Sequence, residues 1–123
     1  MQTTTKLVLC LLLCTSSAYA ETTKMHTSWY GPGLQGNLMA NGKRFDMHDP
    51  SVAAHKHLPF GTHIQLTNPE TGTQHVVVVQ DRGPYIAGRQ LDVSKAAAAK
   101  LGFEDDGVVT LTAIIIIRPQ GSD

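Results

Sequence analysis

The segment Val76–Tyr85 constrains this chain more than any other. Its four consecutive valines, Val76–Val79, predict a strand that is buried on both faces. The sequence Asp-Arg-Gly-Pro follows, and the strand should end there because Gly83 allows a positive φ and Pro84 removes a backbone donor. A carboxylate and a guanidinium at the end of a rigid strand suit a functional site. The same residues are also typical of a solvated turn, and both interpretations remain open on this segment alone.

Residues 1–20 have the pattern of an export signal. Lys6 supplies positive charge, Leu7–Cys14 supplies a short apolar core, and small residues up to Ala20 suit a signal peptidase. The core is shorter than the roughly 20 apolar residues of a membrane span, so we expect no transmembrane segment. We therefore expect cleavage near Ala20 and an exported protein, periplasmic or secreted. A lipoprotein signal that uses Cys14 is the alternative.

The composition of the remaining chain, residues 21–123, excludes several classes of protein. Both cysteines lie in the signal, so no disulfide is expected in the mature domain. Removing Lys6 leaves nine basic residues (10 − 1) against ten acidic ones, which speaks against a nucleic-acid or membrane-surface partner. The six histidines lack cysteine partners and the helical i, i+4 spacing of zinc enzymes, so we expect no metal and no other cofactor.

Turn-forming residues divide the mature chain into short elements at near-even spacing. Strands are predicted over His26–Tyr30, His63–Asn68, Gln74–Gln80 and Val108–Arg118, and short apolar segments at Ser51–His55 and Leu91–Ser94 bring the total to about six. Ser94 is a good N-cap for a short helix over Lys95–Leu101, and Gly102 can end that helix. This pattern predicts an all-β fold, a small closed barrel of six strands with one short helix.

Trp29 and Tyr30 are neighbours on the first predicted strand, so their side chains should point to opposite faces. One should pack in the core, and the other can line a groove as an aromatic platform for a sugar. Packing of both rings in the core or at its rim is the plain alternative. Further along, Asn41-Gly42 predicts a tight turn within an ordered loop beside a strand end.

Five blocks of sequence occur in order along the mature chain. They are Ser28–Gly31, Ala40–Gly42, Ala53–Thr62, Gln80–Tyr85 and Leu91–Ser94. This set closely resembles the rare lipoprotein A (RlpA) family, and the resemblance covers essentially all of residues 21–123. It implies a six-stranded double-psi β-barrel. It also implies a peptidoglycan lytic transglycosylase, a lyase whose partner is the glycan strand, with a preference for strands stripped of stem peptides.

By that resemblance Asp81 matches the catalytic aspartate of the family and His55 its associated histidine. Cleavage of a glycosidic bond requires an acid that protonates the leaving oxygen. In a lytic transglycosylase the muramyl 6-hydroxyl attacks C1 and gives a 1,6-anhydro product, so one carboxyl group can serve as both base and acid. A hydrogen-bonded core histidine is the plain alternative for His55. The expected substrate-binding residues are Trp29, Tyr30, Asn41, Lys43 and Arg82.

The sequence departs from the family pattern at several places. Lys43 stands where the family usually has a glutamate, and a lysine near Asp81 would favour the ionised carboxylate and weaken it as an acid. A catalytically weak or inactive peptidoglycan-binding module is therefore the second hypothesis. Gln80 replaces the usual asparagine, which is a mild change. We also expect no SPOR domain, a soluble exported product, and a structural pairing of Arg82 with Asp92.

Overall fold

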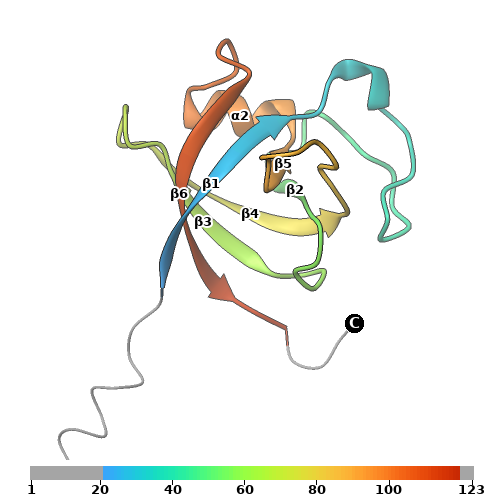
Figure 1. Cartoon of the computed structure of the whole chain (residues 1–123). Coiled ribbons are helices and arrows are strands. Elements are labelled where there is room, and N and C mark those ends of the chain that lie inside the picture. The colour runs from blue at the N-terminus through green and yellow to red at the C-terminus, as the bar shows by residue number, and fades with distance from the viewer. Residues whose placement is uncertain (1–20, 120–123) are drawn as a thin grey trace, which may run out of the picture.

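The computed structural model describes residues 21–119, which form a closed barrel of six strands beside one α-helix (Figure 1). The strands are β1 (Thr22–Trp29), β2 (Val52–His55), β3 (His63–Thr67), β4 (Gln74–Asp81), β5 (Leu91–Val93) and β6 (Val108–Ile117). Their order around the barrel is β1-β5-β2-β4-β3-β6, with β1/β5 and β2/β4 parallel and the other four pairs antiparallel. The predicted closed six-stranded barrel is confirmed. The predicted signal peptide lies outside the described residues.

Strand β1 begins earlier than the sequence predicts. The prediction starts the strand at His26, whereas backbone pairing with β6 holds the polar residues Thr22–Lys24 in strand conformation as well. A short 3-10 helix, η2 (Pro32–Leu34), follows β1 where the sequence predicts a turn. Within residues 21–119 there is no helix long and apolar enough to cross a membrane.

The helix α2 (Lys95–Leu101) has the predicted bounds and the predicted ends. The Ser94 hydroxyl oxygen accepts a hydrogen bond from the Ala97 N–H at 3.1 Å, and Gly102 ends the helix with φ 79°. These local interactions satisfy backbone groups that a helix terminus otherwise leaves unpaired. The buried face of the helix, which includes Ala97 and Leu101, packs against the barrel interior.

Strand β4 is buried on one face only, so the prediction of a strand buried on both faces is wrong. Val77 and Val79 are fully buried in the barrel interior, whereas Val76 is 37% exposed and Val78 is partly exposed. In a closed barrel each strand has one face toward the packed interior and one toward the outside. A run of four valines does not reveal this alternation, because every position is equally apolar.

A second hydrophobic cluster lies outside the barrel interior. It consists of Tyr30, Met39, Phe45, Val52 and Ala54. Met39 and Phe45 come from the long loop between β1 and β2, and the rings of Tyr30 and Phe45 stack with centroids 4.5 Å apart. All four residues of β2 are consequently buried, because the loop covers the face that the interior does not. This loop, drawn in cyan and teal in Figure 1, stands at the side of the barrel where β4 ends.

Candidate active site

A β-bulge at the end of β4 decides where the Asp81 side chain points. Ala53 on β2 pairs with Val79, but the next residue, Ala54, pairs with Asp81, so Gln80 is an extra residue in the ladder. With regular alternation Asp81 would follow Val77 and Val79 into the interior. The bulge instead places Asp81 on the face of Ala54, outside the interior core.

The same residue of β2 has a second acidic neighbour. Ala54 pairs with Asp81 on β4 and with Asp92 on β5, so the two aspartates flank it on one face of the sheet. Because neighbouring strands lie about 4.8 Å apart, the two Cα atoms are about 10 Å apart. Two carboxyl groups from separate strands therefore share one site.

Three hydrogen-bond donors fix the Asp81 carboxylate. Its Oδ1 accepts from the backbone N–H of Ala40 at 2.8 Å and from that of Arg82 at 2.9 Å, and its Oδ2 accepts from the Tyr30 hydroxyl at 3.3 Å. The donors belong to the loop after β1, to the end of β4 and to the end of β1. The carboxylate thus joins three parts of the fold, and its orientation depends on all three.

Tyr30 is a buried donor to Asp81 that also senses the charge of Asp92. Burial, and next the negative charges of Asp81 and Asp92, raise the pKa of the Tyr30 phenol above its ordinary value. The phenol therefore keeps its proton and remains a donor to Asp81. The sequence predicts Tyr30 as a sugar contact, whereas the ring is only 7% exposed and its hydroxyl contacts the aspartate.

The Asp92 carboxyl is less exposed to solvent than an ordinary surface carboxylate. The Ser28 hydroxyl donates a hydrogen bond to its Oδ1. Burial raises the pKa of the Asp92 carboxyl and the charge of Asp81 raises it further, while the Ser28 hydrogen bond and Arg89 oppose the shift. Asp92 is therefore a group that holds a proton to higher pH than an ordinary aspartate, as a general acid must. Sequence reasoning gave it only a structural role, although it lies in the Leu91–Ser94 block.

Arg82 binds backbone oxygens and makes no ion pair with Asp92 in the described part of the chain. Its Nη1 donates to the carbonyl oxygen of His55 at 3.1 Å and to that of Leu58 at 2.9 Å. The guanidinium carbon lies 4.0 Å from the centroid of the Phe60 ring. The predicted pairing of Arg82 with Asp92 is therefore replaced by a clamp between the end of β4 and the loop after β2.

His55 makes no hydrogen bond to Asp81 among residues 21–119. It pairs with the interior residue Leu91, and its Nδ1 accepts from the backbone N–H groups of His57 and Leu58, both at 3.2 Å. Burial, and next the positive charges of His57 and Arg82, lower the pKa of the His55 imidazole to about 4. At neutral pH the ring is thus uncharged, with its proton on Nε2. Its connection to Asp81 runs through Arg82, which contacts both residues.

The lowered pKa of His55 predicts a loss of stability in acid. The folded-state pKa of about 4 lies below the ordinary 6.5, so the unfolded chain binds the proton more tightly and stability falls as the pH drops from about 6.5 toward about 4. The expected contribution is of the order of 2 kcal/mol, reduced from the full value by partial solvent contact. In His55→Asn, whose Oδ1 can replace Nδ1 as acceptor, this contribution should vanish. Thermal unfolding at pH 7.5 and 4.5 measures it; equal pH dependence in both proteins would contradict the prediction.

The remaining predicted binding residues make no hydrogen bond or ion pair to Asp81 within residues 21–119. Trp29 packs against the interior core, and its indole N–H donates to the Glu104 carbonyl oxygen at 3.0 Å. The Asn41 side chain accepts from the Lys43 N–H at 3.0 Å and so shapes the predicted turn. Lys43 is exposed and forms no ion pair with Asp81. The one ion pair within residues 21–119 is Lys95–Glu104, at 3.6 Å.

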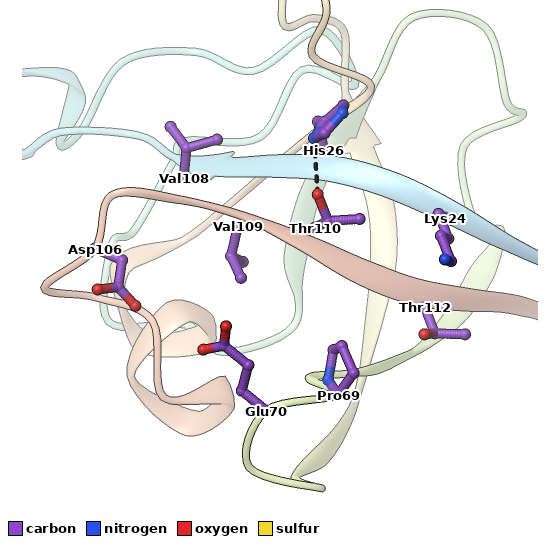
Figure 2. A pocket seen from close by; sticks show the side chains of 9 residues that line it. All are labelled: Lys24, His26, Pro69, Glu70, Asp106, Val108, Val109, Thr110 and Thr112. Carbon is purple, nitrogen blue, oxygen red and sulfur yellow. Dashed lines mark hydrogen bonds between the residues drawn. The ribbon is translucent and has the colours of Figure 1, made fainter.

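One cavity in the described part of the chain is lined by residues other than those of this site. Figure 2 shows it along β1 and β6, with a volume of about 670 Å³. Its lining residues are Lys24, His26, Pro69, Glu70, Asp106, Val108, Val109, Thr110 and Thr112, and none of them contacts Asp81 or Asp92. Residues 21–119 contain no group of three or more histidine, cysteine, aspartate or glutamate side chains placed to hold a metal ion.

The closed six-stranded barrel and the solved structures that it resembles first define a class, the double-psi β-barrels. The barrel is similar to a Streptomyces papain inhibitor, with a TM-score of 0.65 and 23% identity over 79% of this chain and 96% of that one. It is also similar to an expansin of Clavibacter michiganensis, with a TM-score of 0.61 and 23% identity over 82% of this chain and 53% of that one. At such low identity these likenesses concern the fold alone.

The sequence then gives the family. The profile of the family described as lytic transglycolase matches residues 22–113, and the chain belongs to this family, of which RlpA proteins are members. It is 46% identical over 91 residues to the probable endolytic peptidoglycan transglycosylase RlpA of Aquifex aeolicus, and 45% identical over 97 residues to that of Neisseria meningitidis. These matches cover 74% and 79% of this chain but 40% of each relative, so the chain spans less than half of their length.

Proposed function

We propose that the barrel is the catalytic domain of a peptidoglycan lytic transglycosylase. The observation that carries the proposal is the pair of aspartates that the bulge in β4 sets on either side of Ala54. Their environments differ: three donors hold Asp81, whereas Asp92 is half-buried with a raised pKa. Such a difference between two carboxyl groups suits a base and an acid in one reaction. The names of the RlpA relatives support peptidoglycan as the substrate.

The two groups have complementary roles in the proposed reaction. Asp81 accepts the proton of the muramyl 6-hydroxyl as its oxygen attacks C1 and forms the 1,6-anhydro bond. Asp92 donates its proton to the glycosidic oxygen, which leaves as the 4-hydroxyl of the neighbouring sugar. No water is consumed, and one proton moves onto Asp81 as another leaves Asp92. Tyr30 and Arg82 position Asp81, and His55 acts through its contact with Arg82.

The finer parts of the proposal follow the family. The preferred substrate is the glycan strand without stem peptides, and the products carry 1,6-anhydromuramyl ends. The domain acts outside the cytoplasm, in the periplasm or after secretion, following cleavage near Ala20. Peptidoglycan is extracytoplasmic, which agrees with the apolar segment at residues 7–14.

The products of glycan cleavage test this function directly. The mature protein is incubated with peptide-free glycan strands, and the new chain ends are identified by mass spectrometry. Anhydromuramyl ends, lighter than the hydrolysis product by one water, are expected. Ordinary reducing ends would instead show a hydrolase; one that acts by inversion needs room for a water between its two carboxyl groups.

A second candidate function is a peptidoglycan-binding module with little or no turnover. The observation in its favour is Lys43, which takes the place of the family's usual glutamate. Lys43 lies on the loop that supplies the Ala40 N–H to Asp81, so a change at this position is close in sequence to the site. A binding module would sediment with purified sacculi without releasing fragments.

Changing Lys43 to glutamate separates the two candidates. If the domain is active as it stands, Lys43→Glu should alter kcat less than about fivefold, since even an exposed ion pair contributes only about 0–1 kcal/mol, and Lys43 makes none within residues 21–119. A gain of tenfold or more would instead identify a degenerate site that the glutamate restores. Lys24→Glu is the matched control, because this exposed lysine lines the separate cavity of Figure 2.

A further inference from the structure

Tyr85 is an aromatic side chain presented to solvent by a well-anchored backbone. It is 76% exposed, although the two residues before it, Gly83 and Pro84, are buried. Gly83 has φ 125°, and a Cβ atom at that position would lie 3.6 Å from Cε2 of the Tyr85 ring. The ring therefore lies on the side of Gly83 where a Cβ atom would stand, while most of its surface stays open.

Tyr85 is one of several exposed apolar side chains on the two segments that meet at Asp81. Half of the large apolar residues exposed in the described part of the chain occur on the two segments that flank this aspartate. They are Leu34 and Leu38 on the loop after β1, and Tyr85 and Ile86 after β4. The loop after β1 reaches Asp81 through the Ala40 N–H. Figure 1 shows that loop and the segment between β4 and β5 at the same side of the barrel.

We infer that Tyr85 is the aromatic platform for a sugar ring of the glycan strand at this site. The inference rests on the proposed function. A pyranose ring has an apolar face of C–H groups, and an open aromatic ring on the segment directly after Asp81 offers a complementary surface. An aromatic side chain has only two side-chain torsions, so it binds with little loss of entropy. Trp29 and Tyr30, the two aromatic residues that the sequence offers as sugar contacts, are packed against the interior core and in the second cluster, respectively.

The test compares Tyr85→Ala and Tyr85→Phe with the wild-type mature protein. Binding to peptide-free glycan strands is measured by calorimetry, and cleavage of the same strands gives kcat and KM. Ile116→Ala is the matched control, because Ile116 is 46% exposed on β6, which pairs with β1 and β3. Thermal unfolding of all variants checks that the barrel is intact.

Loss of the platform should weaken binding without unfolding the protein. For Tyr85→Ala, Kd and KM should rise by about tenfold, with kcat changed by less than about threefold. Tyr85→Phe and Ile116→Ala should stay within about twofold of wild type. The melting temperature should not change, since the side chain is largely exposed.

Three results would overturn the sugar platform, and they differ in what they imply for the proposed function. If the wild-type protein binds and cleaves the strands and Tyr85→Ala does so equally well, Tyr85 is not a sugar platform, and the proposed function stands. If the wild-type protein neither binds nor cleaves the strands, the proposed function fails and the platform fails with it. A Tyr85→Ala variant that changes only the oligomeric state, in sedimentation, would overturn the sugar platform in favour of a contact between two copies.

Discussion

Replacing Asp81 by asparagine should reduce glycan cleavage by about 100- to 10,000-fold, the range expected for loss of a general acid–base group. The asparagine oxygen can still accept from the Ala40 N–H, so the loop should remain in place. The amide cannot take a proton from the muramyl hydroxyl, and the loss should therefore appear in kcat. Anhydromuramyl ends counted by mass spectrometry measure the loss, and thermal unfolding verifies the fold.

A carboxylate in the separate cavity provides the control for Asp81. Asp106 lines the space along β1 and β6 and has no contact with the aspartate pair. Asp106→Asn should leave turnover unchanged. If Asp106→Asn abolished cleavage and Asp81→Asn did not, the reaction would belong to the cavity of Figure 2, and the assignment of the active site would be wrong.

Replacing Asp92 by asparagine should lower activity and raise stability at neutral pH. Loss of the proton donor should cost kcat a factor of about 100 or more. The raised pKa means that the folded protein favours protonated Asp92. The stabilisation by this group is complete below the ordinary 3.8 and is lost as the pH rises through the folded-state pKa. An asparagine does not ionise, so this loss disappears in the variant.

The stability effect of Asp92→Asn should therefore depend on pH. The variant should melt a few degrees above the wild type at pH 7, and this difference should shrink below pH 4. Asp105→Asn, at an exposed loop position, controls for the removal of one carboxylate and should retain full activity. A variant of Asp92 with normal turnover would leave Asp81 as both acid and base, as a single-carboxylate mechanism requires.

These effects explain why the pair is costly to the fold. Burial of Asp92, together with the nearby negative charge of Asp81, opposes ionisation of the Asp92 carboxyl. The buried Tyr30 hydroxyl and the Ser28 hydroxyl supply hydrogen bonds that compensate in part. Functional sites commonly contain a carboxyl group whose raised pKa lowers the stability of the fold at neutral pH.

Much of the fold could be predicted from short-range chemistry. The helix over Lys95–Leu101 has its predicted bounds because its N-cap and its terminal glycine act within one turn of the chain. The end of β4 at Asp81 follows from the adjacent Gly83 and Pro84. The closed barrel and its family follow from the order of the sequence blocks, and both are confirmed.

The faces of the strands could not be predicted in the same way. The valine run gives no alternation from which to choose an inner face, and the bulge at Gln80 depends on pairing with β2, far away in sequence. Trp29 and Tyr30 were correctly placed on opposite faces, but only the packed core shows which ring is inside. His55 likewise has a lowered pKa because of burial and neighbouring charges that the tertiary structure brings together.

By itself, then, the sequence determined the family, the six-stranded barrel and the position of Asp81 at a strand end. Only the tertiary structure decided that Asp81 points outward, that Asp92 accompanies it across Ala54, and that Arg82 binds the loop carbonyls. The physical reason is the distance along the chain over which each kind of interaction acts. Caps and turns act between residues a few positions apart, whereas register, burial and charge proximity depend on strands that meet only when the barrel closes.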